Sequence, residues 1–110
     1  MSRNDELTDI ERLLLLAVLR LHPHGYGVSI RDEIEARTKR QYSFGTIYTT
    51  LDRLEQRGYV KSREGEATAA RGGRKKLHYE LTGEGNLALE RSLAALDAMR
   101  AGIGWKGAVA

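Results

Sequence analysis

The chain has 110 residues, 41% of them hydrophobic and 30% charged, a balance that is typical of one small folded domain and excludes a disordered chain. It contains no cysteine, which excludes a disulfide framework and thiolate metal sites. The formal net charge of +3 is compatible with a polyanionic partner, although total charge accounts only for non-specific attraction. Because the first residues show no apolar signal segment behind a basic one, we expect a cytoplasmic protein.

The first predicted element is an amphipathic helix from Leu7 to Leu21. Its apolar stripe follows three- and four-residue spacing and consists of Leu7, Ile10, Leu14, Ala17, Val18 and Leu21. Further leucines fall largely outside this stripe, namely Leu13, Leu15, Leu16 and Leu19. A helix that is apolar on more than one side must be covered on more than one side, and a second subunit is the expected cover. The apolar run Leu13–Leu19 is far shorter than the ~20 residues of a membrane helix, so a spanning segment is excluded.

Turn and cap signals separate the next two predicted helices. Pro23 and Gly25 interrupt the helical pattern, and a second helix begins near Tyr26 and covers Val28 to Arg37. Ser43 has the side chain of an N-cap for a third helix, which runs to Arg57. Gly58 then stands where a left-handed residue commonly ends a helix. The predicted buried stripe of the third helix consists of Phe44, Ile47, Leu51 and Leu54.

Two strands and a fourth helix complete the predicted order. The strands are Tyr59–Arg63 and Lys76–Leu81, joined by a long loop from Gly65 to Lys75. Thr82 caps the fourth helix, whose apolar positions are Leu89, Leu93, Leu96 and Met99, and the glycine-rich tail from Gly102 is expected to fray. This order predicts an α+β fold, mainly α, in which a winged helix-turn-helix (residues 1–81) is followed by a dimerisation helix and tail (residues 82–110).

The third helix presents a polar face that could approach nucleic acid. At about 100° per residue, that face consists of Ser43, Thr46, Thr50, Arg53 and Arg57, with Thr49 beside it. No carboxylate precedes Asp52, which suits a helix N-terminus that approaches phosphates or base edges. An ordinary solvated face is the alternative, and the surrounding order of elements favours DNA in a major groove.

The predicted wing loop is strongly basic. Arg71, Arg74, Lys75 and Lys76 place four cations in six residues without an acid, and two glycines let the backbone come close to a partner. Such cations bind phosphates with steep salt dependence and little sequence preference. A merely soluble hairpin tip is the alternative. Tyr48 could reach a phosphate through its hydroxyl or place its ring in the core.

Several of these residues form motifs of a known family. The chain resembles the PadR transcriptional regulators, in its short subgroup, over almost its whole length. Two signatures carry the resemblance, a recognition-helix motif (residues 43–48, then Leu51, Arg53, Leu54, Glu55 and Gly58) and a wing motif (Arg74, Lys75, Tyr79, Leu81, Thr82 and Gly85). Gly25-Tyr26-Gly27 resembles the family's start of helix two.

The resemblance implies a homodimeric repressor on a palindromic operator, released by a ligand. The predicted DNA contacts are Tyr26, Ser43, Thr46, Tyr48, Thr49, Thr50, Arg53, Arg71, Arg74, Lys75 and Lys76. The predicted dimer interface consists of Leu15, Leu16, Leu19, Leu89, Leu93 and Leu96. A planar small-molecule effector would contact Met99 and Trp105, although Trp105 could equally hold the tail in place. No cofactor is expected.

Other functions fit the sequence less well. An enzyme would need a nucleophile or a paired acid and base, whereas the carboxylates are expected among cations on helix surfaces. His22 and His24 could ligate a metal, but they lack further clustered ligands. The open alternative is a winged-helix module that docks a protein or RNA partner, because one fold serves several functions.

Overall fold

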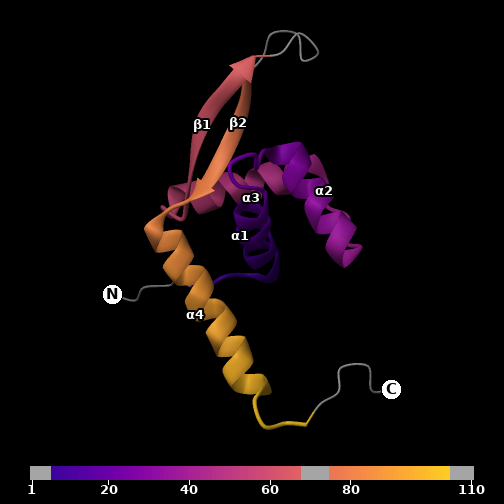
Figure 1. Cartoon of the computed structure of the whole chain (residues 1–110), viewed down its shortest axis with the longest axis vertical. Helices are drawn as coiled ribbons and strands as arrows, with labels where there is room; N and C mark the ends of the chain where they lie inside the picture. Colours follow the sequence, from indigo (N-terminus) through magenta and orange to yellow (C-terminus); the bar gives the residue numbers. More distant parts are fainter. Residues whose placement is uncertain (1–5, 68–74, 105–110) are drawn as a thin grey trace.

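The structure is a computed structural model that describes residues 6–67 and 75–104. Its helices and strands follow the order α1 (Asp9–Leu21), α2 (Gly27–Thr38), α3 (Phe44–Gln56), β1 (Val60–Ala67), β2 (Lys75–Leu81) and α4 (Gly83–Arg100). The first three helices cluster together, the β1–β2 hairpin rises from one side of the cluster, and α4 runs away from the other side (Figure 1). The predicted element order and the mainly helical winged fold are confirmed.

Helix α1 begins two residues later than the sequence analysis predicted. Thr8 is its N-cap, and the hydroxyl of Thr8 accepts a hydrogen bond from the backbone N–H of Glu11 at 3.2 Å. The carboxylate of Glu11 accepts in return from the backbone N–H of Thr8 at 2.9 Å. This reciprocal pair is a capping box, which fixes where the helix starts.

The ends of α3 are set by the residues that were predicted to set them. The hydroxyl of Ser43 accepts from the backbone N–H of Thr46 at 3.1 Å. At the other end, Gly58 takes a left-handed φ of 81°, and Tyr59 donates its backbone N–H to the Leu54 carbonyl at 2.9 Å. A glycine adopts this conformation without the steric cost of a side chain, so the chain leaves the helix and enters β1 directly.

Strand β1 is longer than predicted and takes in part of the expected loop. The antiparallel register pairs Val60 with Leu81 and Glu64 with Leu77, and it shifts between Glu64 and Ala67. A Cβ at Gly65 would lie 2.6 Å from the ring of His78. The glycine therefore lets the histidine ring lie against the strand, and the loop prediction was wrong from residue 65 to residue 67 because glycine was taken only as a loop residue.

Helix α4 starts in close contact with Tyr59, the residue that precedes β1. Its N-cap Thr82 accepts from the backbone N–H of Gly85 at 3.0 Å, which confirms the predicted cap. A Cβ at Gly85 would lie only 2.0 Å from the carbonyl oxygen of Tyr59. This close approach of two backbones fixes the direction in which α4 leaves the hairpin.

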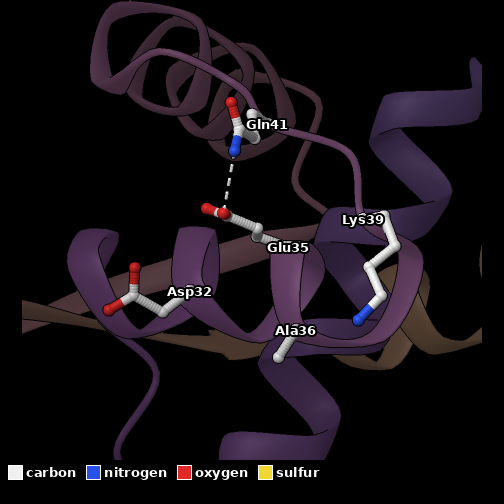
Figure 2. A pocket seen from close by; sticks show the side chains of 5 residues that line it. All are labelled: Asp32, Glu35, Ala36, Lys39 and Gln41. Carbon is white, nitrogen blue, oxygen red and sulfur yellow. Dashed lines mark hydrogen bonds between the residues drawn. The ribbon is translucent and has the colours of Figure 1, made fainter.

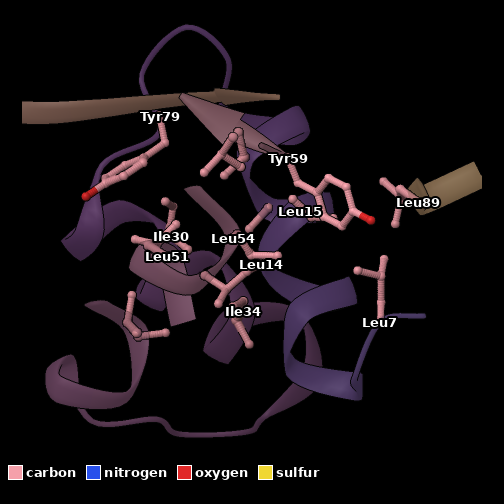
Figure 3. Packing of buried hydrophobic residues seen from close by; sticks show 14 of the residues in the cluster. Leu7, Leu14, Leu15, Ile30, Ile34, Leu51, Leu54, Tyr59, Tyr79 and Leu89 are labelled. Atoms are coloured by element: carbon pink, nitrogen blue, oxygen red, sulfur yellow. The ribbon is translucent and has the colours of Figure 1, made fainter. Parts of the chain in front are cut away.

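The core lies among the first three helices and the base of the hairpin (Figure 3). Its largest fully buried apolar side chains are Leu14, Leu15, Ile30, Ile47, Leu51, Leu54, Val18 and Val60. Leu7, Tyr59 and Leu89 lie at one edge of the cluster, where α4 joins it. Leu15 was predicted outside the buried stripe of the first helix, and this was wrong, because α1 is enclosed by the other elements over a wider arc than one stripe.

Candidate nucleic-acid interface

The first half of α3 exposes hydroxyl groups at a helix N-terminus. Ser43, Thr46 and Thr49 are all exposed, and the first turn contains no acidic residue. The Ser43 hydroxyl lies 3.0 Å from that of Thr46, so the two side chains form one polar group at the helix start. The helix dipole adds partial positive charge here, which favours an anionic or electron-rich partner.

Thr50 does not share this exposed face. It is buried, and its hydroxyl donates to the backbone carbonyl of Thr46 at 2.8 Å. Its position three residues after Ile47 and four before Leu54 places it at the edge of the buried stripe. The predicted placement was therefore wrong, because the backbone carbonyl satisfies the hydroxyl and allows a polar residue to be buried.

Two aromatic residues lie at the junction of α2 and α3. Phe44, predicted to be buried, is 39% exposed, because it is the first residue of α3 and lies at the edge of the helix cluster, where the guanidinium of Arg31 packs on its ring at 4.0 Å. Tyr48 is also 39% exposed. A Cβ at Gly27 would lie 2.0 Å from the Tyr48 hydroxyl oxygen, so the tyrosine rests against the start of α2. Its ring is thus neither in the core nor free in solvent.

The described part of the wing brings one predicted cation next to α2. The ammonium of Lys76 lies 4.1 Å above the ring of Tyr26, and the His78 ring is 5.6 Å from the same tyrosine. A cation–π contact of this kind holds the beginning of β2, next to the wing loop, against the start of α2. Arg71 and Arg74 lie outside the described residues, as does the side chain of Lys75.

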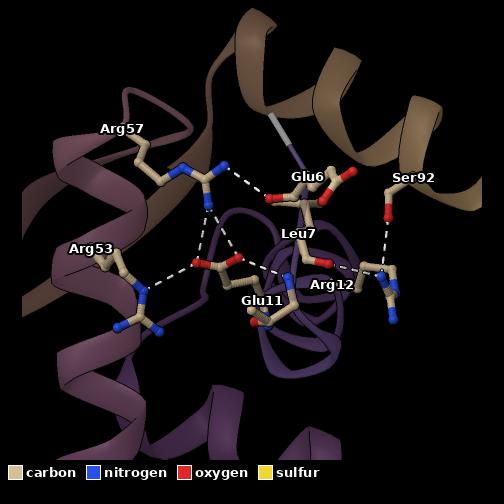
Figure 4. A network of polar contacts seen from close by, with 8 residues as sticks. Glu6, Leu7, Glu11, Arg12, Arg53, Arg57 and Ser92 are labelled. Carbon is tan, nitrogen blue, oxygen red and sulfur yellow. Dashed lines mark hydrogen bonds and ion pairs between the residues drawn. The ribbon is translucent and has the colours of Figure 1, made fainter. Parts of the chain in front are cut away.

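Two arginines in and just after the second half of α3 form hydrogen bonds with a buried carboxylate of α1. Glu11 is 1% exposed and accepts hydrogen bonds from Arg53 Nε at 3.1 Å and from one terminal nitrogen of Arg57, at 3.1 Å to each oxygen (Figure 4). We call this set, with the backbone N–H of Thr8, the Glu11 network. Burial acts to raise the pKa of Glu11, but the hydrogen bonds from Thr8, Arg53 and Arg57 outweigh it and the pKa lies below its ordinary value.

Glu11 was not among the predicted site residues, because the carboxylates were expected on helix surfaces. The signal was present in the spacing Thr8-x-x-Glu11, which is a capping-box motif. Arg53, predicted to contact DNA, keeps 47% of its side chain exposed beside its bond to Glu11. The side chain of Arg57 is 23% exposed, and it also donates to the Glu6 carbonyl at 3.0 Å.

The predicted dimer residues fall into two groups. Leu15 and Leu89 are buried within the chain's own core, so they offer no surface to a partner. Leu16 and Leu93 are partly buried, whereas Leu19 and Leu96 are about half exposed. For the predicted effector, Met99 is highly exposed, and Trp105 lies outside the described residues. Among the described residues, no group of three or more His, Asp or Glu side chains could hold a metal, and no helix is long and apolar enough to cross a membrane.

A polar hollow lies beside the end of α2 and the turn that follows (Figure 2). It is lined by Asp32, Glu35, Ala36, Lys39 and Gln41. The side-chain amide of Gln41 donates to the Glu35 carboxylate at 3.0 Å across the opening. Two carboxylates against one lysine make the hollow unsuitable for phosphate, so it does not extend the candidate interface.

The geometry of a hydroxyl-bearing helix beside a hairpin that carries Lys76 agrees with what the sequence matches. A family model described as the transcriptional regulator PadR-like family matches residues 15–91. The chain belongs to this family. It is therefore a winged-helix, DNA-binding transcriptional regulator, and the expectation that it is not an enzyme is confirmed by the membership.

Solved structures of other proteins share the fold. A PadR family transcription regulator from Clostridium difficile R20291 is 24% identical with a TM-score of 0.70, the match covering 84% of this chain and 91% of that one. A transcriptional regulator from Clostridium thermocellum is 24% identical with a TM-score of 0.69, covering 82% of both chains. A structure described as a complex of hsRosR is 25% identical with a TM-score of 0.69, covering 84% of this chain and 75% of that one. No curated protein matches the sequence.

Proposed function

We propose that the chain represses transcription as a homodimer that places two α3 helices in successive major grooves of a palindromic operator. The observation that carries this proposal is the first half of α3, where exposed hydroxyls lie at a helix N-terminus with no acidic residue in the first turn. A helix of this kind fits the major groove, where each base pair presents a distinct pattern of donors and acceptors.

Base reading falls to the exposed residues of this half. Ser43, Thr46 and Thr49 can donate to or accept from base edges, and a threonine methyl can press on the methyl of thymine. Arg53 is close enough to the same face to contribute a phosphate contact with the part of its guanidinium that Glu11 leaves exposed. Thr50 is left out of the proposed face because it is buried.

The wing supplies affinity that is independent of sequence. Lys76 at the beginning of β2, together with Arg71, Arg74 and Lys75, which are close to it in the sequence, would neutralise phosphates and release counterions. Tyr26 and Tyr48 support this contact from α2 and α3, since Tyr26 underlies the Lys76 ammonium and the Tyr48 hydroxyl reaches the start of α2.

Dimerisation is supported by the apolar surface of α4. Within the part of the chain that the structure describes, only the beginning of this helix is buried, at Gly85, Ala88 and Leu89. Further along, exposed fractions are 44% for Leu96 and 78% for Met99, and Ile103 after the helix is 61% exposed. A surface of this kind on a helix that leaves its own core is typical of a subunit interface. A second copy that brings α4 against Leu16 and Leu19 of α1 would cover both surfaces, with residues 82–110 as the dimerisation segment.

An effector would bind where the two subunits meet. Met99 and Trp105 are the proposed contacts for a planar compound, because a flexible thioether and an indole both pack well on flat rings. Titration with a panel of planar compounds tests this, with tryptophan fluorescence and operator release as the readouts. Compounds that change neither signal would count against an effector site.

Selection of genomic fragments by the purified protein, followed by footprinting and a promoter reporter, tests the proposed function. We expect enriched fragments with two half-sites whose centres lie about 10 base pairs apart or a multiple of that, and a reporter that is silenced by the protein. A single unpaired footprint of monomer width would contradict the dimer on a palindrome. Fragments that are not enriched at all, with retention of RNA or of a protein instead, would overturn DNA reading.

A further inference from the structure

Phe44 lies half exposed at the first position of α3, the end proposed to face DNA. Phe44 and Tyr48 stand one helical turn apart, and each is 39% exposed. Their ring centroids are 6.5 Å apart, so the two rings form one apolar surface, which we call the aromatic ledge. The hydroxyl groups of Ser43 and Thr46 lie directly beside it in the sequence and are exposed as well.

The aromatic ledge is held in place by α2. The guanidinium of Arg31 lies 4.0 Å from the Phe44 ring centroid, and its Nε is buried. The Tyr48 ring rests against Gly27, where no side chain would fit. Contacts from two residues of α2 therefore restrict both rings before any partner arrives, which lowers the entropy lost on binding.

We propose that Phe44 is a specificity residue that contacts the 5-methyl group of a thymine in each half-site. This inference rests on the proposed function, because it requires that the start of α3 enters the major groove. The thymine methyl is the one apolar group that an unmodified base pair presents there, and phenylalanine is a side chain suited to contact it. The hydroxyl groups of α3 would form hydrogen bonds with donors and acceptors on the base edges, whereas the exposed ring of Phe44 would contact the thymine methyl group.

The chemistry gives the contact a distinctive signature. Deoxyuridine pairs as thymine does and presents the same hydrogen-bonding groups, but it lacks the methyl. Loss of one buried methyl group weakens binding about fourfold. A cytosine methylated at C5 carries a methyl group at the same position of the major groove, so a contact of this kind also responds to methylation of a C·G pair placed at that step.

The test measures the affinity of operators in which each thymine in turn is replaced by deoxyuridine, for the wild type and for Phe44→Ala. We expect one thymine per half-site at which the replacement weakens the wild type about fourfold, while Phe44→Ala binds both operators equally. Phe44→Leu keeps an apolar side chain and should keep most of the discrimination. Gln56→Ala, at the exposed far end of the same helix, should leave it unchanged.

The outcomes separate this inference from the function on which it rests. If the wild type binds its operator but no deoxyuridine substitution matters, or if the effect persists in Phe44→Ala, the methyl contact is overturned and DNA binding stands. If the protein binds no DNA, both are overturned. Thermal melting of each variant confirms that the fold is intact. If Phe44→Ala fails to fold, Phe44→Gln replaces it, because the polar side chain keeps some bulk but should lose the discrimination that Gln56→Ala keeps.

Discussion

The two halves of α3 carry similar polar residues but lie in opposite surroundings. In the first half, Thr46 and Thr49 are exposed, and the first turn of the helix contains no acidic residue. In the second half, Arg53 and Arg57 bind the buried carboxylate of Glu11. The helix is therefore anchored to α1 at its C-terminal end and exposed at its N-terminal end. Polarity alone does not distinguish a residue that reads DNA from one that fixes the reading helix in place.

The same short stretch of α1 also contacts α4. Arg12 donates to the Leu7 carbonyl at 3.0 Å and to the Ser92 hydroxyl at 3.2 Å (Figure 4). Since Glu11 and Arg12 are adjacent, the start of α1 joins the proposed reading helix to the proposed dimer helix. The anchored half of α3 thus fixes the position of the exposed half relative to a second subunit.

Glu11→Ala should cause the largest change, a decrease of about 3 kcal/mol in the free energy of unfolding. The substitution leaves two arginines without their shared acceptor and removes the capping box of α1. Urea denaturation measures the decrease. Asp52→Ala, which removes an exposed acid from α3, is the matched control and should change stability by less than about 0.5 kcal/mol. Equal effects of the two substitutions would show that the Glu11 network does not anchor the helix.

Arg57→Ala and Arg53→Ala should separate anchoring from DNA contact within the second half. Arg57 bonds both oxygens of Glu11 and is the more buried, so its loss should lower stability by about 2 kcal/mol. Arg53 makes one such bond and is half exposed, so its loss should lower stability less and DNA affinity more. Urea denaturation and titration with operator DNA measure the two effects. If Arg53→Ala instead lowered stability more and Arg57→Ala lowered DNA affinity more, the DNA-contacting part of α3 would extend to the end of the helix.

Low pH should weaken the Glu11 network, which holds the second half of α3, before it affects the exposed first half. The pKa of Glu11 lies below its ordinary value of 4.5, so the unfolded chain takes up this proton at a higher pH than the folded chain does. The stabilisation is complete above about pH 5 and is lost as the pH falls through the folded-state pKa. Urea denaturation at several pH values should show a smaller fall below pH 5 for Glu11→Gln than for the wild type. Parallel curves would assign the acid sensitivity to other carboxylates, such as Asp9, whose pKa the hydrogen bond from Arg40 lowers.

Thr49→Val tests the exposed half, with an expected effect of about 1 kcal/mol in discrimination between operator sequences. Valine keeps the shape of threonine and removes only the hydroxyl, which makes no hydrogen bond within the described part of the chain. Stability should therefore stay within about 0.5 kcal/mol of the wild type. Selection from a randomised operator library measures the preference. An unchanged preference at every position would remove Thr49 from the reading face.

The sequence was sufficient to predict the features that depend on local chemistry. The caps at Ser43 and Thr82, the left-handed Gly58 and the order of elements all follow from residue type and spacing, and the structure confirms them. Thr50 was predicted to be exposed and Phe44 to be buried, and both predictions were wrong. Helical periodicity predicts which face of the helix a residue lies on, whereas burial also depends on how far the neighbouring elements extend along that face. The capping role of Glu11 could be predicted from the local spacing Thr8-x-x-Glu11, but its bonds to Arg53 and Arg57 could not, because these partners lie 42 and 46 residues away along the chain.

The smallest expected effect on DNA binding is that of substituting Lys76, which lies outside α3. It tests the difference between residues that contact bases and residues that contact only phosphates. The Tyr26 ring holds its ammonium in place, and the proposed phosphate contact at the beginning of β2 should be lost in Lys76→Ala. We expect the slope of log affinity against log salt to fall by about 0.9, with operator preference unchanged. Lys61→Ala, an exposed cation at the start of β1, is the matched control. A changed preference with the full salt slope would place Lys76 among the reading residues, because only base contacts discriminate between sequences without releasing counterions.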